Sequence, residues 1–570
     1  MDFSERAKKN LFEIDFESEI KNERINYKYQ LRKKHNQNKL MEIRKKRILL
    51  LNQNSDKNNE SNSEKTLLSK SDISGNMPLL NKISKENINI ILECLNSDNF
   101  ENIKWVIYSL RTFFQKYDPE LDEYLILFEN KIYLYFENLL KKYENTIYII
   151  NEILFIISNL FSYDEIINKY PENYFLFFLN DFYLSFYQKC FVLGEEVLIV
   201  SVFITLENIL AGKNALIKKI FKEKEFIFSI LDIINEKKMN LDVLIHFLKF
   251  FKMIIIEIKD EYIKEKHLFY LIFDRIYSIY KLCDKKDLNI IKEIFLIIIY
   301  AFECKYQNKN SDENYIIMHY LFKERELEEN QAKNIKFVYY ILSSLYNNPN
   351  FYLINDEMLY VSLNLLDNIT YNCNLYEINE ITTCGSYKFF EILNNYIKYK
   401  IKNNVLNNQN ESCLIIKLLK ISNNIIDFDI QLARKLVFTE FFENLIIYFS
   451  KNLSNKTVVE IFLDTFLRLL GHEDKIIADN LFKRGILYEG IFCSLLNNCD
   501  YHFNEKMVLK MMKIILNYFQ IVFHIKQEDK FSREDILFYS KFKDFITNSN
   551  IISEEIRESI LSLDIMKIII

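Results

Sequence analysis

Apolar residues at helical spacing are the feature of this sequence that most restricts its fold. From about Lys85 to the C-terminus they recur every three or four positions, for example at Ile88, Ile91 and Leu95. This spacing places them on one face of an α-helix. The chain has only 7 Gly and 4 Pro in 570 residues, whereas β-sandwiches and α/β proteins need Gly at their tight turns. The sequence therefore predicts an all-α fold.

The helical blocks repeat along the chain. Each repeat reads as a helix, a short polar break and a second, more apolar helix. Second helices of this kind are expected at Ile150–Ser162, Glu196–Gly212, Leu288–Phe302, Tyr360–Thr370 and Val458–Gly471. A helical unit of roughly 40–47 residues is typical of armadillo and HEAT repeats. We therefore predict a right-handed armadillo-type α-solenoid of about ten repeats.

A basic helical segment precedes this solenoid. Between Lys21 and Arg47, eleven Lys and Arg oppose Glu23 and Glu42, a net charge of +9 on a chain of −5. The remainder therefore carries −14. We expect three parts: a basic arm (1–51), a flexible polar linker (52–84) and the solenoid (85–570). Such an arm can bind nucleic acid, an anionic membrane, an acidic partner or its own acidic body. A solvated tail without a partner is the alternative.

Composition and motifs argue against several other classes of protein. The N-terminus lacks the apolar core of a signal peptide, and the run Ile294–Phe302 is too short to span a bilayer. Nine scattered Cys without a C-x-x-C pair suit a reducing compartment. The phosphate-loop, nucleophile-elbow and zinc-protease motifs are absent from the sequence. We therefore expect an intracellular protein that is not an enzyme, binds no cofactor or metal and does not insert into membranes.

An asparagine returns inside several of the apolar helices, at Asn159, Asn208, Asn368 and Asn423. Asn208 and Asn368 are 160 residues apart, which fits four repeats of about 40. Since an unpaired amide is costly in an apolar setting, these residues need hydrogen-bond partners. Chance recurrence in an asparagine-rich chain is one explanation. The other is a ladder of amides along the concave groove that clamps the backbone of an extended peptide.

The order of these parts resembles the importin alpha family. The segments "YQLRKK" and "IRKKR" of the arm are similar to that family's "ELRK" and "KRR" clusters. The segment Ser109–Leu125 resembles the family's first repeat, and Phe542–Ile565 resembles its last repeat. The likeness spans nearly the whole chain but is faint in the middle, and the arm carries its most specific part.

The resemblance implies specific partners. The arm would bind importin beta, and its basic cluster would also occupy the cargo groove in cis, so that the protein inhibits itself. The residues with this implied role are Arg32, Lys33, Lys34, Arg44, Lys45, Lys46 and Arg47. The last repeat would dock an export receptor, and the protein would shuttle between cytoplasm and nucleus.

The resemblance also implies a cargo groove, although its key positions differ here. The implied groove residues are Phe155, Asn159, Asn208, Asn368 and Asn423. In the family a Trp stands four residues before each groove Asn and holds cargo Lys by cation–π attraction. Here those positions are Phe155, Ile204, Asn364 and Leu419. The only Trp, Trp105, is expected in the core.

A second departure concerns the acid that receives a cargo lysine in this family. The matching stretch, "ENILAGK", ends in Lys213. A like charge there would oppose a cargo lysine by about 1 kcal/mol or more. Asp164 or Glu207 could replace the missing acid, or cargo could use the later repeats near Asn368 and Asn423.

Two functions remain open from the sequence. The first is a nuclear import adaptor that binds signal-bearing cargo in the groove and importin beta through the arm, with no nucleic acid expected. The second is an armadillo or HEAT scaffold whose basic arm binds RNA, a membrane or another protein. Steep salt dependence of RNA binding would mark the second.

Overall fold

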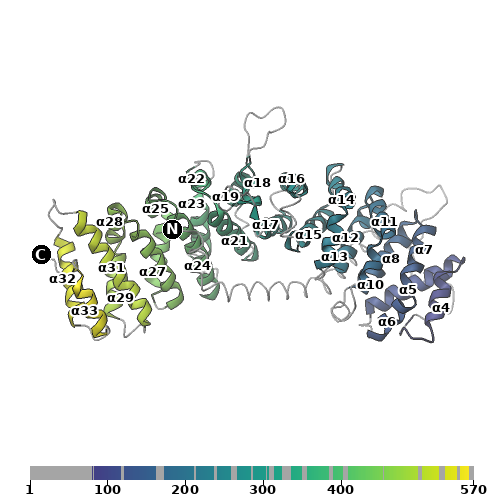
Figure 1. The fold of residues 1–570 in the computed structure, drawn as a ribbon, viewed down its shortest axis with the longest axis horizontal. Coiled ribbons are helices and arrows are strands. Elements are labelled where there is room, and N and C mark those ends of the chain that lie inside the picture. Colours follow the sequence, from purple (N-terminus) through teal and green to yellow (C-terminus); the bar gives the residue numbers. More distant parts are fainter. Residues whose placement is uncertain are drawn as a thin grey trace, which may run out of the picture. The chain divides into compact units, whose positions relative to one another are not determined.

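The structure is a computed structural model with side chains. It describes residues 80, 82–116, 121–161, 173–210, 214–236, 240–257, 266–283, 287–302, 305–306, 314–323, 336–348, 356–383, 389–401, 408–453, 455–497, 503–525, 533–548, 553–563 and 566. These residues form two compact units, divided between Leu282 and Cys283. Each unit consists of stacked helices, as the sequence predicted, and the chain is an all-α solenoid (Figure 1).

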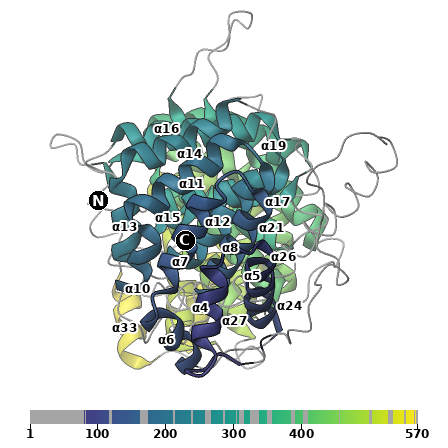
Figure 2. The same ribbon diagram turned by 90° about the vertical axis from the view of Figure 1, so that its right-hand side faces the viewer.

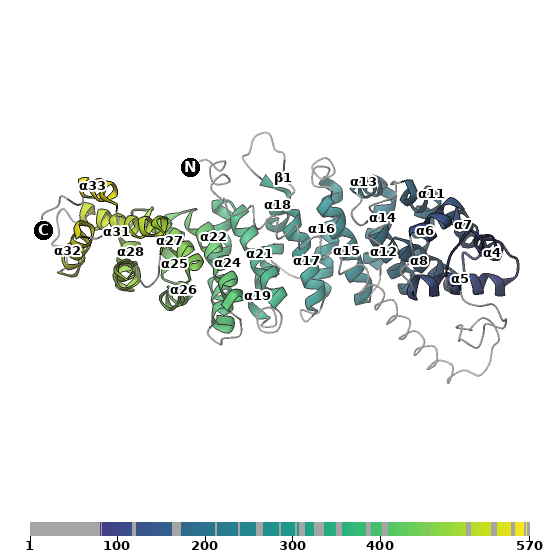
Figure 3. The ribbon, with the colours of Figure 1, turned by 90° about the horizontal axis from the view of Figure 1, so that it is seen from below.

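A row of long helices runs through each unit, and neighbouring members of a row pack side by side (Figures 1 and 3). We call these the long-helix rows. In unit 1 the row is α5 (Phe100–Lys116), α8 (Ile147–Leu160), α12 (Glu196–Leu210) and α15 (Leu241–Glu257). In unit 2 it is α17 (Leu288–Ala301), α21 (Asp356–Asn372), α24 (Asn408–Ile426), α27 (Lys456–Leu470) and α31 (Glu505–Ile525).

A second row of helices covers one side of each long-helix row. In unit 1 it comprises α4 (Ile88–Leu95), α7 (Ile132–Lys142), α11 (Asp181–Leu193), α14 (Lys224–Glu236) and α16 (Lys266–Leu282). In unit 2 it comprises α18 (Ile316–Phe322), α19 (Phe337–Asn347), α23 (Phe389–Tyr396) with the π-helix η3 (Ile397–Ile401), α26 (Glu440–Lys451), and the π-helix η4 (Ile486–Phe492) with α29 (Cys493–Leu496). Figure 2 views unit 1 along its rows, with α4 and α5 in front.

Short helices join one repeat to the next. They are α6 (Leu121–Glu129), α10 (Asn173–Leu176) with the 3₁₀ turn η2 (Phe177–Leu179), α13 (Asn214–Lys222), α22 (Leu375–Thr383), α25 (Ile430–Val437) and α28 (Lys475–Lys483). The described C-terminal part ends with α32 (Arg533–Asn548) and α33 (Glu554–Ser562). A short, a medium and a long helix therefore recur, which fits the predicted armadillo-type solenoid but adds one short helix to the two that the sequence predicted for each repeat.

The spacing of the long helices corrects one detail of the prediction. In unit 1 they begin 45 to 49 residues apart, slightly more than the predicted 40–47. In unit 2, α17 and α21 begin 68 residues apart, because an antiparallel pair of two-residue strands and α18 intervene. The strands are β1 (Lys305–Tyr306) and β2 (Asn314–Tyr315). The 160 residues from Asn208 to Asn368 therefore cover three repeats, and the expected four was wrong.

Local sequence signals set where several helices begin and end. The Asn180 side chain accepts a hydrogen bond from the Tyr183 backbone N–H and caps α11, as an N-cap residue does. The same helix ends at Gly194, whose φ of 68° suits a residue without Cβ. Thr439 caps α26 in the same way as Asn180 caps α11. Polar breaks in the sequence thus coincide with helix boundaries.

The most apolar helices are buried almost all round, as the sequence predicted. In α12, 12 of 15 residues are buried, and in α8, 12 of 14. Burial of this much Ile, Leu, Val and Phe is the main stabilising force in each unit, at about 25 cal/mol per Å² of apolar surface. Trp105 on α5 is 9% exposed, which confirms its prediction as a core residue.

Candidate functional site

Part of the predicted site lies outside the described residues. This applies to the arm residues Arg32, Lys33, Lys34 and Arg44–Arg47, and to Lys213. Their roles stay predictions. The groove residues Phe155, Asn159, Asn208, Asn368 and Asn423 are described, and all of them lie on long-helix rows.

In unit 1 a cation of the chain itself lies over the Phe155 ring. The guanidinium carbon of Arg111, on α5, is 5.7 Å from the ring centre, on the neighbouring helix α8. Arg111 Nη1 is also 3.4 Å from a carboxylate oxygen of Glu152, one turn before Phe155. Phe155 is 2% exposed and Glu152 3%. The aromatic ring and the carboxylate therefore form a cation-binding arrangement that Arg111 occupies.

Burial strongly affects the Glu152 carboxyl. Removal from water raises its pKa well above the usual range, and the charge of Arg111 opposes that rise. A buried carboxylate is tolerated when an adjacent cation and hydrogen bonds replace its lost hydration. The pair therefore belongs to the packing between α5 and α8.

The amides of Asn159 and Asn208 are buried and paired. Asn159 Nδ2 donates to the Phe155 carbonyl at 2.7 Å. Asn208 Nδ2 donates to the Ser158 carbonyl at 3.0 Å and to its hydroxyl at 2.8 Å, which joins α12 to α8. Each side chain is 3% exposed. These hydrogen bonds meet the need for partners that burial creates, and a role of the two amides in clamping a peptide stays a prediction.

Further polar contacts join α8 and α12 at the same register. The Ser201 hydroxyl donates to Asn151 Oδ1 at 2.6 Å, and the Thr205 hydroxyl donates to the Leu154 carbonyl at 3.1 Å. The paired residues are 50 and 51 apart in sequence, and Asn208 and Ser158 are 50 apart. The sequence analysis did not predict this network. Its signal in the sequence is that small polar residues recur about one repeat apart in two apolar helices.

A second carboxylate lies on the unit 1 row, at Glu207 on α12. Its Oε1 is 2.9 Å from Nδ1 of His246, on the neighbouring helix α15. The Glu207 side chain is 15% exposed, whereas the imidazole is fully buried. Ile204, which stands where the resemblance expects a Trp, is fully buried as well.

In unit 2 the two predicted asparagines are more accessible. Asn368 on α21 and Asn423 on α24 are both half-buried. Asn368 Nδ2 donates to the Asn364 carbonyl of its own helix at 2.8 Å. The Asn423 side-chain oxygen is buried, and no described residue forms a hydrogen bond with it. Of the predicted groove amides, these two therefore have side-chain surface that a ligand could contact.

Asp367 lies next to Asn368 and joins α21 to α24. Its carboxylate accepts from Lys417 Nζ at 3.3 Å and from Asn424 Nδ2 at 3.1 Å. Asn424 Nδ2 also lies 3.2 Å from the Thr370 hydroxyl. Both Asp367 and Lys417 are less than one-fifth exposed. The segment around Asn368 is therefore held by an interhelix network of charged and amide groups.

Ion pairs continue along the unit 2 row. Arg468 on α27 pairs with Asp427, just after α24. Lys506 and Lys510 on α31 both pair with Glu460 on α27, at 2.9 and 3.3 Å. The hydrogen bond from Lys506 lowers the pKa of Glu460. Asp427 and Glu460 on the unit 2 row are thus each paired with cations of the next long helix.

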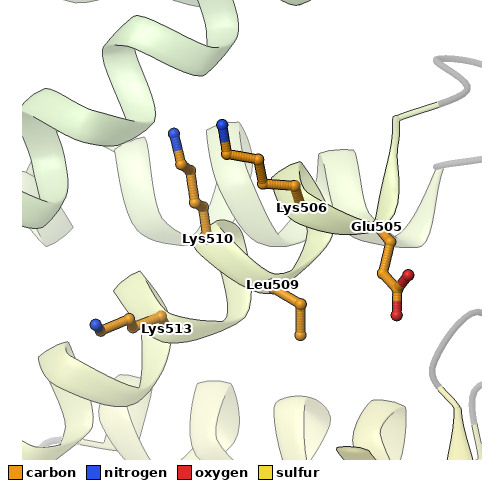
Figure 4. Close-up of a pocket in the computed structure, with 5 residues that line it drawn as sticks. All are labelled: Glu505, Lys506, Leu509, Lys510 and Lys513. Carbon is orange, nitrogen blue, oxygen red and sulfur yellow. The ribbon is translucent and has the colours of Figure 1, made fainter. Parts of the chain in front are cut away.

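An open hollow of about 470 Å³ lies on α31. Its lining residues are Glu505, Lys506, Leu509, Lys510 and Lys513. Figure 4 shows Lys506 and Lys510 pointing the same way, with Leu509 and Glu505 directed away from them. The hollow combines both signs of charge with one Leu.

Two searches of the described residues bear on other functions. No group of three or more His, Cys, Asp or Glu in these residues is placed to hold a metal ion. Among the helices of the same part of the chain, none has the length and apolarity to cross a bilayer.

Comparisons with known proteins show only loose likenesses. No protein-family model matches the chain, and a search of curated proteins found no match. An engineered protein matches at a TM-score of 0.42 and 12% identity, over 76% of this chain and 98% of its own. A designed armadillo repeat protein matches at a TM-score of 0.35 and 16% sequence identity, over 49% of this chain and 98% of its own. A structure from a study of cadherin and beta-catenin matches at a TM-score of 0.38 and 10% sequence identity, over 75% of this chain and 93% of its own. These TM-scores are too low to identify a family or a partner.

Proposed function

We propose that this protein is an adaptor of nuclear import, which binds signal-bearing cargo along its solenoid and importin beta through its basic arm. One observation carries the proposal: a segment of net charge +9 precedes an α-solenoid, in a chain whose remainder carries −14. That order of parts, with the arm motifs "YQLRKK" and "IRKKR", is the order that importin alpha has.

The charge distribution supports two alternating positions of the arm. Lys and Arg at helical spacing would pair with the carboxylates of importin beta and steer its encounter. Without that partner, the cluster Arg44–Arg47 would compete with cargo for the solenoid, because a tether keeps its effective concentration high. Importin beta would then free the cargo site by withdrawing the arm.

We propose that cargo binds to the later repeats, in unit 2, and not to the unit 1 row. Asn368 and Asn423 keep side-chain surface and lie beside the carboxylates Asp367 and Asp427. An exposed amide group of an asparagine can donate to or accept from a peptide backbone, whereas Asp367 and Asp427 already pair with Lys417 and Arg468. One solved structure with a loosely similar fold, a designed armadillo repeat protein, has the peptide (KR)4 bound.

The remaining parts of the proposal follow from the same resemblance. The segment Phe542–Ile565, which includes α33, would dock an export receptor. The protein would then shuttle between cytoplasm and nucleus. The alternative is a solenoid scaffold whose arm binds RNA, a membrane or another protein.

The deciding experiment is a titration of the full chain with importin beta. We expect binding by the wild type and its loss when Arg44–Arg47 are changed to Ala. A second variant, with Arg32, Lys33 and Lys34 changed to Ala, tests the other arm cluster. The matched control removes four exposed lysines from unit 2 instead, Lys435, Lys451, Lys456 and Lys483. Its affinity for importin beta should stay within about twofold of the wild type, since isolated surface charges contribute little.

The same proteins should be titrated with a single-stranded RNA at several salt concentrations. Failure to bind importin beta, together with RNA binding whose affinity falls steeply with salt, would replace the adaptor with the RNA-binding scaffold. Binding of importin beta that survives both arm variants would show that the arm is not the binding element.

A further inference from the structure

We infer that salt controls how tightly the long helices of unit 2 stack, because ion pairs join each of these helices to the next. The inference does not depend on the proposed function. It concerns a response of the solenoid itself. At high ionic strength the contacts between neighbouring long helices of unit 2 open more often, whereas the contact between α8 and α12 in unit 1 stays closed. We call each such contact between two long helices a junction.

Every junction of the described unit 2 row contains at least one ion pair. We call this series the ion-pair ladder. Its members are Lys292–Glu357 (α17–α21), Lys417–Asp367 (α21–α24), Arg468–Asp427 (α24–α27), and at α27–α31 Lys506–Glu460, Lys510–Glu460 and Lys510–Asp464. Charge therefore contributes to stacking along the whole of this row.

The charges of the ladder follow a regular order over three junctions. At α21–α24, α24–α27 and α27–α31 the acid belongs to the earlier helix or the residue after it, and the base to the later helix. Only α17–α21 has the reverse order among these junctions. The helix α27 thus directs Arg468 toward α24 and holds Glu460 toward α31. Screening by salt therefore weakens the attraction on both sides of this helix.

The ladder is partly buried, so its pairs can matter for stacking and still respond to dissolved ions. The Lys417 and Asp367 side chains are 14% and 19% exposed, whereas Glu357 is 58% exposed. The distance over which salt screens charges falls from about 10 Å at 0.1 M to about 3 Å at 1 M. Partly buried pairs are screened less than exposed ones, but solvent reaches each pair of the ladder.

The α27–α31 junction is the best place to measure the effect. Glu460 Oε1 lies 2.9 Å from Lys506 Nζ and 3.3 Å from Lys510 Nζ, and Lys510 Nζ is also 2.6 Å from Asp464. The hydrogen bond from Lys506 lowers the pKa of Glu460. Both lysines line the open hollow on α31 (Figure 4). Ions from solution therefore have access to this junction.

The α8–α12 junction of unit 1 serves as an internal reference. Its described polar contacts join neutral, buried groups, namely Ser201 to Asn151, Thr205 to the Leu154 carbonyl and Asn208 to Ser158. Salt screens interactions between charges, so these hydrogen bonds should keep their strength. Effects of salt on apolar packing act on both junctions and cancel in the comparison.

The test is hydrogen exchange of the full chain, followed by mass spectrometry in 0.1 M and 1 M NaCl. Peptides from α27 and α31 are compared with peptides from α8 and α12 in the same sample, because exchange of protected amides reports local opening. We expect the higher salt to accelerate exchange in α27 and α31 about threefold to tenfold relative to α8 and α12.

The decisive variant removes the charges of one junction with little change of shape. It combines Glu460→Gln, Asp464→Asn, Lys506→Gln and Lys510→Gln. At 0.1 M NaCl its α27 and α31 should already exchange faster than in the wild type, and added salt should change their relative exchange by less than about twofold. Lys510→Met alone keeps the apolar stem of the side chain. It should lose part of the salt response, and it tests the inference if the fourfold variant does not fold.

The matched control combines Lys435→Gln and Lys451→Gln, which remove two exposed lysines of unit 2. It should keep the full salt response at α27–α31. An equal salt response of the α27–α31 and α8–α12 junctions in the wild type would overturn the inference. A full salt response in the fourfold variant, or in Lys510→Met where only that variant folds, would overturn it as well. Neither result bears on the binding of importin beta, so the proposed function is tested separately.

Discussion

The guanidinium of Arg111 lies over the ring of Phe155, 5.7 Å from its centre, and pairs with Glu152 on the same helix. Phe155 is the residue that the sequence predicted to hold a cargo lysine. A cation of the protein itself thus occupies the face of that ring, and it links α5 to α8. This relationship makes the contact a structural element of unit 1 whether or not a peptide binds nearby.

We predict that Arg111→Ala destabilises unit 1 by about 3 kcal/mol, because Glu152 is left as a buried charge without its cation. Trp105 is the only Trp and lies on the same helix as Arg111. Its fluorescence during urea unfolding therefore reports on unit 1. Lys104→Ala is the control, since its pair with Glu101 is partly exposed and should contribute less than about 1 kcal/mol. Equal effects of the two substitutions would contradict the structural role of the pair.

The raised pKa of Glu152 predicts a pH dependence. Burial raises this pKa in the folded state above its value in the unfolded chain, so the native state binds more protons across that window. Stability then falls as pH rises from the ordinary glutamate range toward the folded pKa. Glu152→Gln does not titrate, so its unfolding free energy minus that of the wild type should grow as pH rises. Trp105 fluorescence unfolding curves between pH 4.5 and 8 measure this difference, and a constant difference would contradict it.

The asparagines of the two units should respond differently to substitution. Asn208→Ala removes both donors to Ser158 from a buried site, and we expect a loss of about 1–3 kcal/mol in unit 1 stability. Asn368 is half-buried, and its Nδ2 donates to a carbonyl of its own helix, so Asn368→Ala should cost less than about 0.5 kcal/mol. Circular dichroism and Trp105 fluorescence measure the two effects. If Asn368→Ala instead weakens peptide binding without this stability loss, its amide belongs to the cargo surface.

The sequence was informative where helical periodicity decides the structure. The helix α12 lies inside its predicted range, α8 overlaps its predicted range but begins three residues earlier, and Trp105 is in the core. Periodicity depends on neighbours three and four residues apart, so it can be read from a single sequence. The number of repeats between Asn208 and Asn368 was wrong, because dividing the 160 residues by about 40 assumes repeats of equal length, whereas α17 and α21 begin 68 residues apart.

The contacts at the site could not be predicted in the same way. Arg111 and Glu152 are 41 residues apart, and Glu207 and His246 are 39 apart. Whether such residues meet depends on the register of adjacent helices to within one turn. Helix boundaries predicted from sequence are less precise than that. For the same reason, the sequence could not show that Asn159 and Asn208 are buried whereas Asn368 and Asn423 are partly accessible.

Asp367 gives the last prediction, which concerns the surface beside Asn368. Its carboxylate joins α21 to α24 through Lys417 and Asn424, at less than one-fifth exposure. We expect Asp367→Ala to destabilise unit 2 by about 1–3 kcal/mol, since both donors lose their acceptor. Glu440→Ala is the control, because its pair with Lys398 is 3.8 Å long and more than half exposed, and it should have little effect. Hydrogen exchange at α21 and α24 measures the change locally. Faster exchange only in Asp367→Ala would show that the proposed cargo surface is held rigid by this residue, whereas unchanged exchange would mean that apolar packing alone fixes the two helices.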